Sequence, residues 1–165
     1  MKYSKQVINN TVLRYMSEGM NNDDILDSFL MMKMSNDFNE EYSLGKKAPS
    51  LSDIKKELLG TDVMEEKDYN VKMFGIVNIS VTRLSVKISP TCTLNIENAR
   101  GALQAKLNEK NRTTMSLQTT KAKDVAMWII RQKENYENYL DEWNSVMKAV
   151  SKKTKGNRMS MLAIK

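Results

Sequence analysis

The amino-acid sequence predicts an α+β fold, and the periodicity of its apolar residues in three stretches leads to this expectation. Apolar residues recur at helical spacing between Tyr3 and Met34, share alternate positions between Val71 and Ile96, and return to helical spacing between Ala122 and Val150. The expected order is an N-terminal helical hairpin, a small antiparallel β-meander, and two C-terminal helices, of which the last is long and heptad-patterned. A chain of 165 residues is long enough to bury a core without disulfides or a structural metal.

The N-terminal hairpin is predicted from two amphipathic segments and the turn between them. The first helix is expected at residues 3–16 and ends before Gly19, where a helix C-terminus favours a residue at positive φ. The second helix begins after a cap at Asn21 or Asn22, has acidic residues in its first turn, and extends to Met34. An αα-hairpin is therefore expected.

The segment after this hairpin is polar, and we expect residues 35–50 to form a loop. A short helix should follow, from a cap at Ser50 or Ser52 through Leu59. The chain then divides into an acidic helical region (1–60), an acidic linker (61–70), a β-meander with a basic helix pair (71–150), and a basic, mobile tail (151–165).

The β-meander is predicted from alternation with period two. A run of apolar residues shares odd positions in 71–81 and even positions in 84–96, so a bulge or a tight turn is expected near Thr82. Pro90 suits a type I turn between two strands. Two or three antiparallel strands result, with the lone Cys92 as a small buried strand residue.

The C-terminal half should be mostly helical. A first helix is expected over Glu97–Lys110, and a second, long helix begins near Ala122, with apolar residues repeating every seven positions. Such a seam needs a partner, either the other helices of the same chain or a coiled coil with another chain. The residues of the seam are Ile129, Tyr136, Leu140, Trp143, Met147 and Val150.

The composition excludes much of the chemistry of enzymes. The chain has no histidine and one cysteine, which removes the commonest general base and most transition-metal sites. The acid-x-Lys elements at residues 53–55 and 65–67 resemble part of a nuclease site but lack a further carboxylate on a neighbouring strand. No glycine-rich phosphate loop is present. We therefore expect no enzyme, no catalytic residue, no metal and no cofactor.

Residues 18–25 resemble the turn and second-helix opening of a helix-turn-helix of the response-regulator type. A glycine, a bulky apolar residue and capping asparagines precede an acidic residue followed by isoleucine. The resemblance implies a recognition helix from about Ser35. Asp37, Glu40 and Glu41 would then face DNA phosphates, and their repulsion favours the plain hairpin as the alternative.

A charge split between the two halves is the main functional signal. Residues 1–70 have 9 Lys/Arg and 13 Asp/Glu, whereas residues 71–165 have 17 and 7. The positive half is typical of proteins that bind phosphate or an acidic protein surface. Lys148–Lys165 alone has six basic residues and no acidic one. The candidate phosphate contacts are Arg100, Lys106, Lys110, Arg112, Lys121, Lys123, Arg131, Lys152, Lys153, Lys155 and Arg158.

Two hypotheses about function follow. The first is a small nucleic-acid-binding accessory protein that holds DNA or RNA through salt-sensitive, non-specific phosphate contacts. The high Asn, Lys and Met content suggests an AT-rich coding sequence, as in many phages. The second is a protein-interaction or inhibitor module, or a homo-oligomeric assembly protein, that acts through the heptad seam. The polar N-terminus and the lack of an apolar run of ~20 residues predict a cytoplasmic protein that does not contact a membrane.

Overall fold

The computed structural model describes residues 4–42, 48–59, 67–71, 75–79, 83–99, 102–109, 113–119 and 121–156. The helices are α1 (Lys5–Ser17), α2 (Asn22–Glu41), α3 (Leu51–Leu59) and α4 (Ala122–Gly156). The strands are β1 (Lys67–Val71), β2 (Gly75–Ile79), β3 (Arg83–Ser89), β4 (Cys92–Ala99), β5 (Ala102–Leu107) and β6 (Thr114–Leu117). The strands form one antiparallel sheet in sequential order, so the predicted α+β class and β-meander are confirmed.

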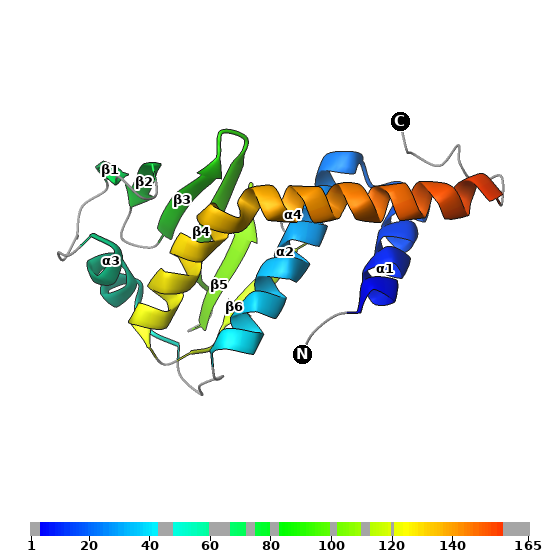
Figure 1. Cartoon of the computed structure of the whole chain (residues 1–165). Coiled ribbons are helices and arrows are strands. Elements are labelled where there is room, and N and C mark those ends of the chain that lie inside the picture. Colours follow the sequence, from blue (N-terminus) through cyan, green and yellow to red (C-terminus); the bar gives the residue numbers. More distant parts are fainter. Residues whose placement is uncertain are drawn as a thin grey trace.

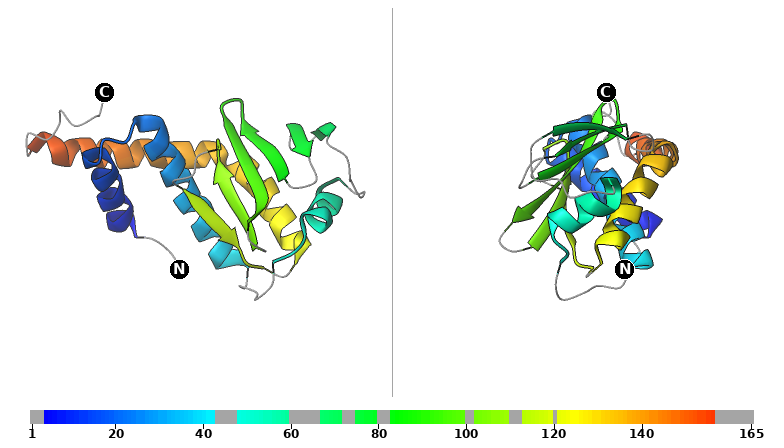
Figure 2. Two further views of the ribbon diagram at one scale, coloured as in Figure 1. Left: turned by 180° about the vertical axis from the view of Figure 1, so that it is seen from behind. Right: turned by 90° about the vertical axis from the view of Figure 1, so that its left-hand side faces the viewer.

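The fold has two layers. The sheet forms one layer, and α2, α3 and the first part of α4 cover one of its faces (Figures 1 and 2). Alternate residues of the central strands, such as Leu84, Leu94 and Ile96, point into the core between the layers and are fully buried. The opposite face of β3 to β6 carries polar side chains. This pattern is typical of an antiparallel sheet that is covered on one side.

The turn between the first two helices has the predicted chemistry. Gly19 has φ 81°, and the backbone N–H of Asp24 donates a hydrogen bond to Oδ1 of Asn21 at 2.8 Å. The predicted cap and glycine stop are therefore confirmed.

The second helix is longer than predicted, because α2 continues to Glu41. The prediction of a loop from residue 35 was wrong for 35–41. Phe38 is fully buried and Asn36 is 4% exposed, so side chains of this mostly polar segment pack inside the protein. No separate recognition helix begins at Ser35, and the helix-turn-helix resemblance does not extend past the turn.

The short third helix is confirmed, with the N–H of Asp53 donating to Oγ of Ser50 at 3.1 Å. The strands begin earlier than expected, because β1 starts at Lys67, inside the segment assigned to a linker. Residues 61–66 of that segment, and the bulge or turn expected near Thr82, lie outside the described residues.

The predicted helix over Glu97–Lys110 is wrong. This segment contains the end of β4 and all of β5, in which Leu94 pairs with Leu107 and Ile96 pairs with Ala105. Leu103 and Leu107 lie four residues apart, a spacing that places two side chains on one face of either a helix or a strand. Fully buried Ala105 between them reveals the period of two.

The long C-terminal helix is confirmed. α4 has 35 residues, which corresponds to a length of about 50 Å at 1.5 Å per residue. It continues through residues 151–156, which had been assigned to a mobile tail, whereas 157–165 lie outside the described residues. Its second part projects past the sheet, and α1 packs against it there (Figures 1 and 2). None of the helices that the structure describes is long and apolar enough to cross a membrane.

The heptad seam of α4 is covered by the rest of the same chain. Ile129 and Val150 are fully buried and Trp143 is 8% exposed. The other three seam residues, Tyr136, Leu140 and Met147, are partly buried. α4 contacts α1, α2, α3 and β3. The seam therefore packs within one chain, which is the first of the two alternatives that its pattern predicted.

Candidate anion-binding site

Among the predicted basic residues whose side chains the structure describes, the positions are spread over the sheet and both ends of α4. Lys106 lies on the outer face of β5, Lys121 and Lys123 lie at the start of α4, and Lys152 lies near its end. The 29 residues from Lys123 to Lys152 correspond to a helix length of up to about 44 Å. Outside the described part of the chain are Arg100, Lys110, Arg112 and Arg158, together with the side chains of Lys153 and Lys155.

Two of the predicted phosphate contacts form ion pairs within the protein. Nζ of Lys106 lies 2.9 Å from Oε1 of Glu97, and Nη1 of Arg131 lies 2.9 Å from Oε1 of Glu41. The hydrogen bond from Lys106 lowers the pKa of Glu97, which keeps that carboxylate ionised. These two cations are already neutralised by neighbouring carboxylates.

On the outer face of β3 to β6 the described positive and negative side chains are nearly balanced. Arg83 bridges two carboxylates, with Nη2 3.3 Å from Oε2 of Glu97 and Nη1 2.6 Å from Oε1 of Glu109. On the same face Ser85 donates a hydrogen bond to Oδ1 of Asn95 at 2.6 Å. Among the described strands this polar face is a hydrogen-bonded network rather than a positive surface.

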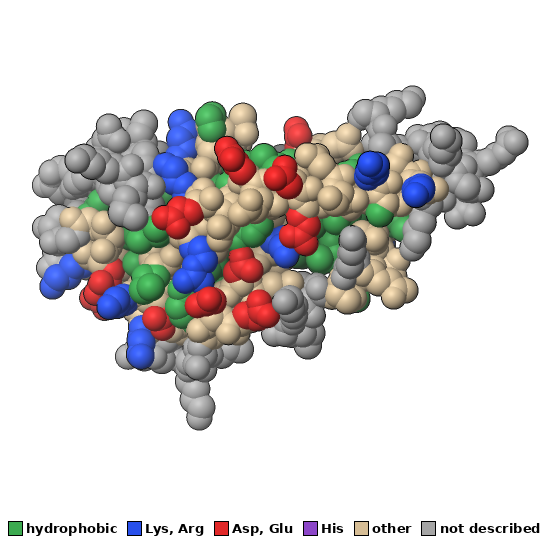
Figure 3. Space-filling model, viewed as in Figure 1, with side chains coloured by type: hydrophobic (Ala, Val, Ile, Leu, Met, Phe, Trp, Pro, Cys, Tyr) green, Lys and Arg blue, Asp and Glu red, His purple; other side chains and the backbone are tan. Residues whose placement is uncertain are grey.

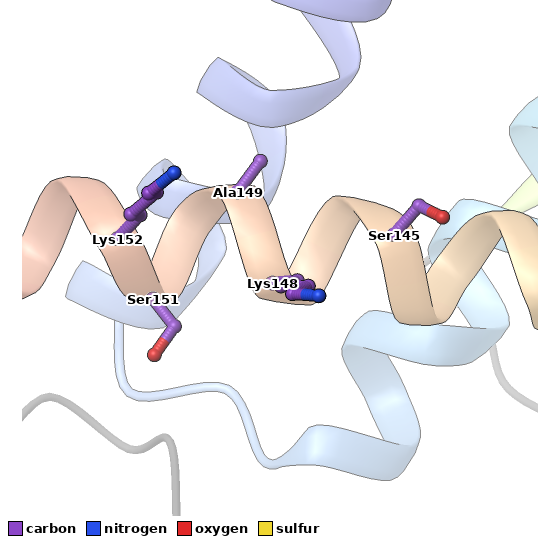
Figure 4. Close-up of a pocket in the computed structure, with 5 residues that line it drawn as sticks. All are labelled: Ser145, Lys148, Ala149, Ser151 and Lys152. Carbon is purple, nitrogen blue, oxygen red and sulfur yellow. The ribbon is translucent and has the colours of Figure 1, made fainter.

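The C-terminal end of α4 has a different character. Lys148 and Lys152 are exposed, and together with Ser145, Ala149 and Ser151 they line a hollow of about 530 Å³ (Figure 4). Ser145, Lys148 and Lys152 lie on one helix face because their spacing is three and then four residues. Ammonium and hydroxyl groups are hydrogen-bond donors, so this arrangement suits an anion with several acceptor oxygens.

The charge along α4 changes sign before this hollow. Glu134, Glu137, Asp141 and Glu142 lie exposed in the middle of the helix, whereas residues 143–156 contain four lysines and no acidic residue. Figure 3 shows red side chains over the middle of α4 and blue ones toward its C-terminal end. On α4, a basic stretch without carboxylates is therefore found in the last turns of the helix. Lysines there also interact favourably with the helix dipole.

Sequence reasoning found Lys152 but missed the two serines. Ser145 and Ser151 each lie three residues from Lys148, on the turns before and after it. That spacing on a helix was the available signal. This spacing indicates a site only when the surface of α4 that the other elements leave uncovered is known.

A buried polar cluster joins α2 to α4. It explains why α4 has the polar residue Gln132 at a position where the heptad pattern would place an apolar one. Gln132 is fully buried, and its Oε1 accepts a hydrogen bond from the Tyr139 hydroxyl at 2.5 Å. The same hydroxyl hydrogen-bonds to Asp37. Burial, followed by the adjacent Asp37, raises the pKa of Tyr139 and keeps the phenol neutral. The cluster lies between helices, where it fixes their packing.

Cys92 is expected to be unreactive in the folded protein. It is 2% exposed, and burial together with the nearby charge of Asp27 raises its pKa to about 12. Because the thiolate is the nucleophile, iodoacetamide at pH 8 should leave the native protein unmodified, as measured by intact mass. Addition of guanidinium chloride should restore the labelling rate of an ordinary thiol. Equal rates in native and denatured protein would contradict this burial.

The described residues contain no group of three or more His, Cys, Asp or Glu side chains that could hold a metal ion. The hollow on α4 is the candidate site, and the side chains that line it include hydrogen-bond donors suited to an anion. No protein-family model, no curated protein and no solved structure matches the chain.

Proposed function

We propose that the protein is a nucleic-acid-binding accessory protein that contacts the phosphate backbone through the C-terminal end of α4. The observation that supports this most is the exposure of Lys148 and Lys152 beside a hollow, on a segment without acidic residues. Within the described residues, ion pairs instead engage Lys33, Lys106 and Arg131. Lys121 and Lys123 at the start of α4 are exposed as well, but Lys148 and Lys152 are the pair that lines the hollow.

Binding of this kind would be independent of base sequence and sensitive to salt. Lysine contacts to phosphate position a nucleic acid but read no bases. Trp128 and Trp143 are 0% and 8% exposed, so neither indole offers a surface on which bases could stack. We therefore expect DNA and RNA to bind through charge alone.

Reversing two lysines of the site should reduce the salt dependence of binding. For Lys148→Glu combined with Lys152→Glu, the slope of log affinity against log salt should fall by about 2, since each phosphate contact contributes about 0.9. Fluorescence anisotropy with labelled single- and double-stranded DNA and RNA, titrated with salt, measures this slope.

A matched control separates a local site from net charge. Lys56→Glu combined with Lys87→Glu changes two exposed lysines on α3 and β3 and alters the net charge by the same amount. If both double variants lose affinity equally, the protein has no phosphate site on α4. If wild-type binding disappears near 0.15 M salt, the positive half serves an acidic protein surface instead, as the protein-interaction hypothesis expects.

A further inference from the structure

Within the described part of the chain, β6 has only β5 beside it in the sheet. β6 is the last strand in the order and pairs with β5 in the register Gln104 to Ser116. No backbone hydrogen bond joins Thr114–Leu117 to another described segment. Among the described residues, the backbone groups on the outer side of β6 therefore have no strand partner. Such an edge is a template for pairing between chains.

β6 is short, with four residues, but the sequence around it lacks the charged residues and proline that protect many edge strands. Residues 113–120 contain no charged residue, no proline and no glycine, and half of them are threonine. Proteins commonly protect edges with lysine, proline or a bulge, and uncharged stretches of high β-propensity favour pairing. The opposite edge differs, because β1 begins with Lys67 and Asp68.

The side chains of β6 determine which strand can pair with it. Met115 is 6% exposed and Leu117 is fully buried, both on the core side, whereas Thr114, Ser116 and Gln118 are exposed. A partner strand must place its apolar side chains on the core side in the same alternation. A second β6, antiparallel and centred on Ser116, meets this requirement.

That arrangement is self-complementary at every position. Ser116 faces the same residue of the other chain, Thr114 faces Gln118, and Met115 faces Leu117. Polar residues then meet polar ones on the outer side, apolar residues meet apolar ones on the core side, and no two like charges meet. α2 contacts both β5 and β6, so the two α2 helices would flank the two-fold axis beneath the joined strands.

We propose that two copies of this chain associate through β6, so that their six-stranded sheets join into one continuous sheet. The interface is isologous, because the same strand contributes from both sides of the two-fold axis. This inference does not depend on nucleic-acid binding. Dimerisation would nevertheless affect nucleic-acid binding, because a dimer presents two basic helix ends to one polymer and gains affinity through multivalency.

Charge substitutions at the axis test the proposal. Sedimentation velocity of the full chain, from micromolar to millimolar concentration, should show a monomer–dimer equilibrium for the wild type. Ser116→Lys or Ser116→Glu places two like charges directly opposite each other, so each should raise the dissociation constant about fivefold or more. An equimolar mixture of the two variants pairs opposite charges and should restore or strengthen association.

Gln104→Lys is the matched control. It adds the same charge to the same face, one strand further from the axis, and Gln104 pairs directly with Ser116. In the dimer the two 104 positions would lie about 14 Å apart, three strand spacings, which is beyond the screening length of ~8 Å. A monomeric wild type, an equal loss in Gln104→Lys, or a mixture that does not reassociate would each overturn the proposal. Circular dichroism verifies that every variant is folded.

Discussion

Replacing Trp128 with alanine is expected to lower the free energy of unfolding by about 3 to 5 kcal/mol. The indole is fully buried, and its Nε1 donates a hydrogen bond to the carbonyl oxygen of Met34 at 3.2 Å. Its ring meets the edge of Phe38, with centroids 5.5 Å apart at 81°. Removing the side chain leaves a cavity between α2 and α4, and the Met34 carbonyl keeps only its hydrogen bond within the helix. Urea unfolding followed by circular dichroism measures the loss.

The neighbouring residue provides the control for this experiment. Met127 is 43% exposed, so Met127→Ala removes a side chain from the same turn of α4 without opening a cavity. We expect its free energy of unfolding to change by less than about 0.5 kcal/mol. Comparable losses in the two variants would contradict the claim that packing against α2 determines the loss in Trp128→Ala, since alanine favours the helix at both positions.

Local signals were enough to predict the beginning of the fold. A glycine at positive φ, a capping asparagine and a capping serine each act on backbone groups within three or four residues, so their effect is visible in the sequence. Gly19, Asn21 and Ser50 all occupy the expected positions. The long apolar repeat of α4 is likewise a property of one segment, and it predicted the helix correctly.

Elements that depend on distant partners could not be predicted in this way. Residues 35–41 look like a loop because they are polar, yet Asp37 hydrogen-bonds to Tyr139, about a hundred residues away. Gln132 fills the gap in the heptad seam through the same contact. The segment around Leu103 and Leu107 fitted a helix as well as a strand, and only its pairing with β4 decides between them.

The candidate site could likewise be predicted only in part, because its charge is a local property and the pairing of its cations is not. The basic character of the C-terminal half is a property of composition and was visible at once. Whether a given cation is available depends on which carboxylate the fold brings beside it. Arg131 lies next to Glu41, and Lys106 lies next to Glu97. The residues of each pair are too far apart in the sequence for a local pattern to predict their contact. Ion pairing and exposure reduced the described candidates to Lys121, Lys123 and Lys152, and the hollow beside Lys152 distinguishes the end of α4.

Asn108 joins α2 to the sheet, and Asn108→Asp should destabilise the protein by about 2 to 3 kcal/mol at neutral pH. Asn108 has φ 53°, a conformation that asparagine and aspartate tolerate. Its Nδ2 donates to both carboxylate oxygens of Asp27, at 3.2 and 3.4 Å, and its Oδ1 accepts from the N–H of Thr93 at 2.8 Å. Asp27 is 6% exposed. The substitution keeps the shape but replaces the donor with a second carboxylate.

The loss should depend on pH in a defined direction. Two carboxylates at this distance raise their pKa values in the folded state above the ordinary value of about 3.9. The folded variant then binds more protons than the unfolded chain, so its stability decreases as pH rises from about 4 through the raised pKa. Relative to the wild type, the variant should be least stable at neutral pH and should recover as pH falls toward 4. Thermal unfolding across this range measures the difference.

Asn108→Gly separates lost hydrogen bonds from added charge. Glycine keeps the positive φ and removes the side chain, so it should cost about 1 to 2 kcal/mol. Asp27 then loses a hydrogen bond but gains no charged neighbour, so its pKa rises less and the pH dependence is weaker than in Asn108→Asp. If the two variants lost the same free energy of unfolding at every pH, the added charge would have no effect. The Asn108 amide would then only fill space. A recovery at low pH that is larger in Asn108→Asp would establish that the amide of Asn108 stabilises the Asp27 carboxylate by hydrogen bonding where α2 meets the β5 turn.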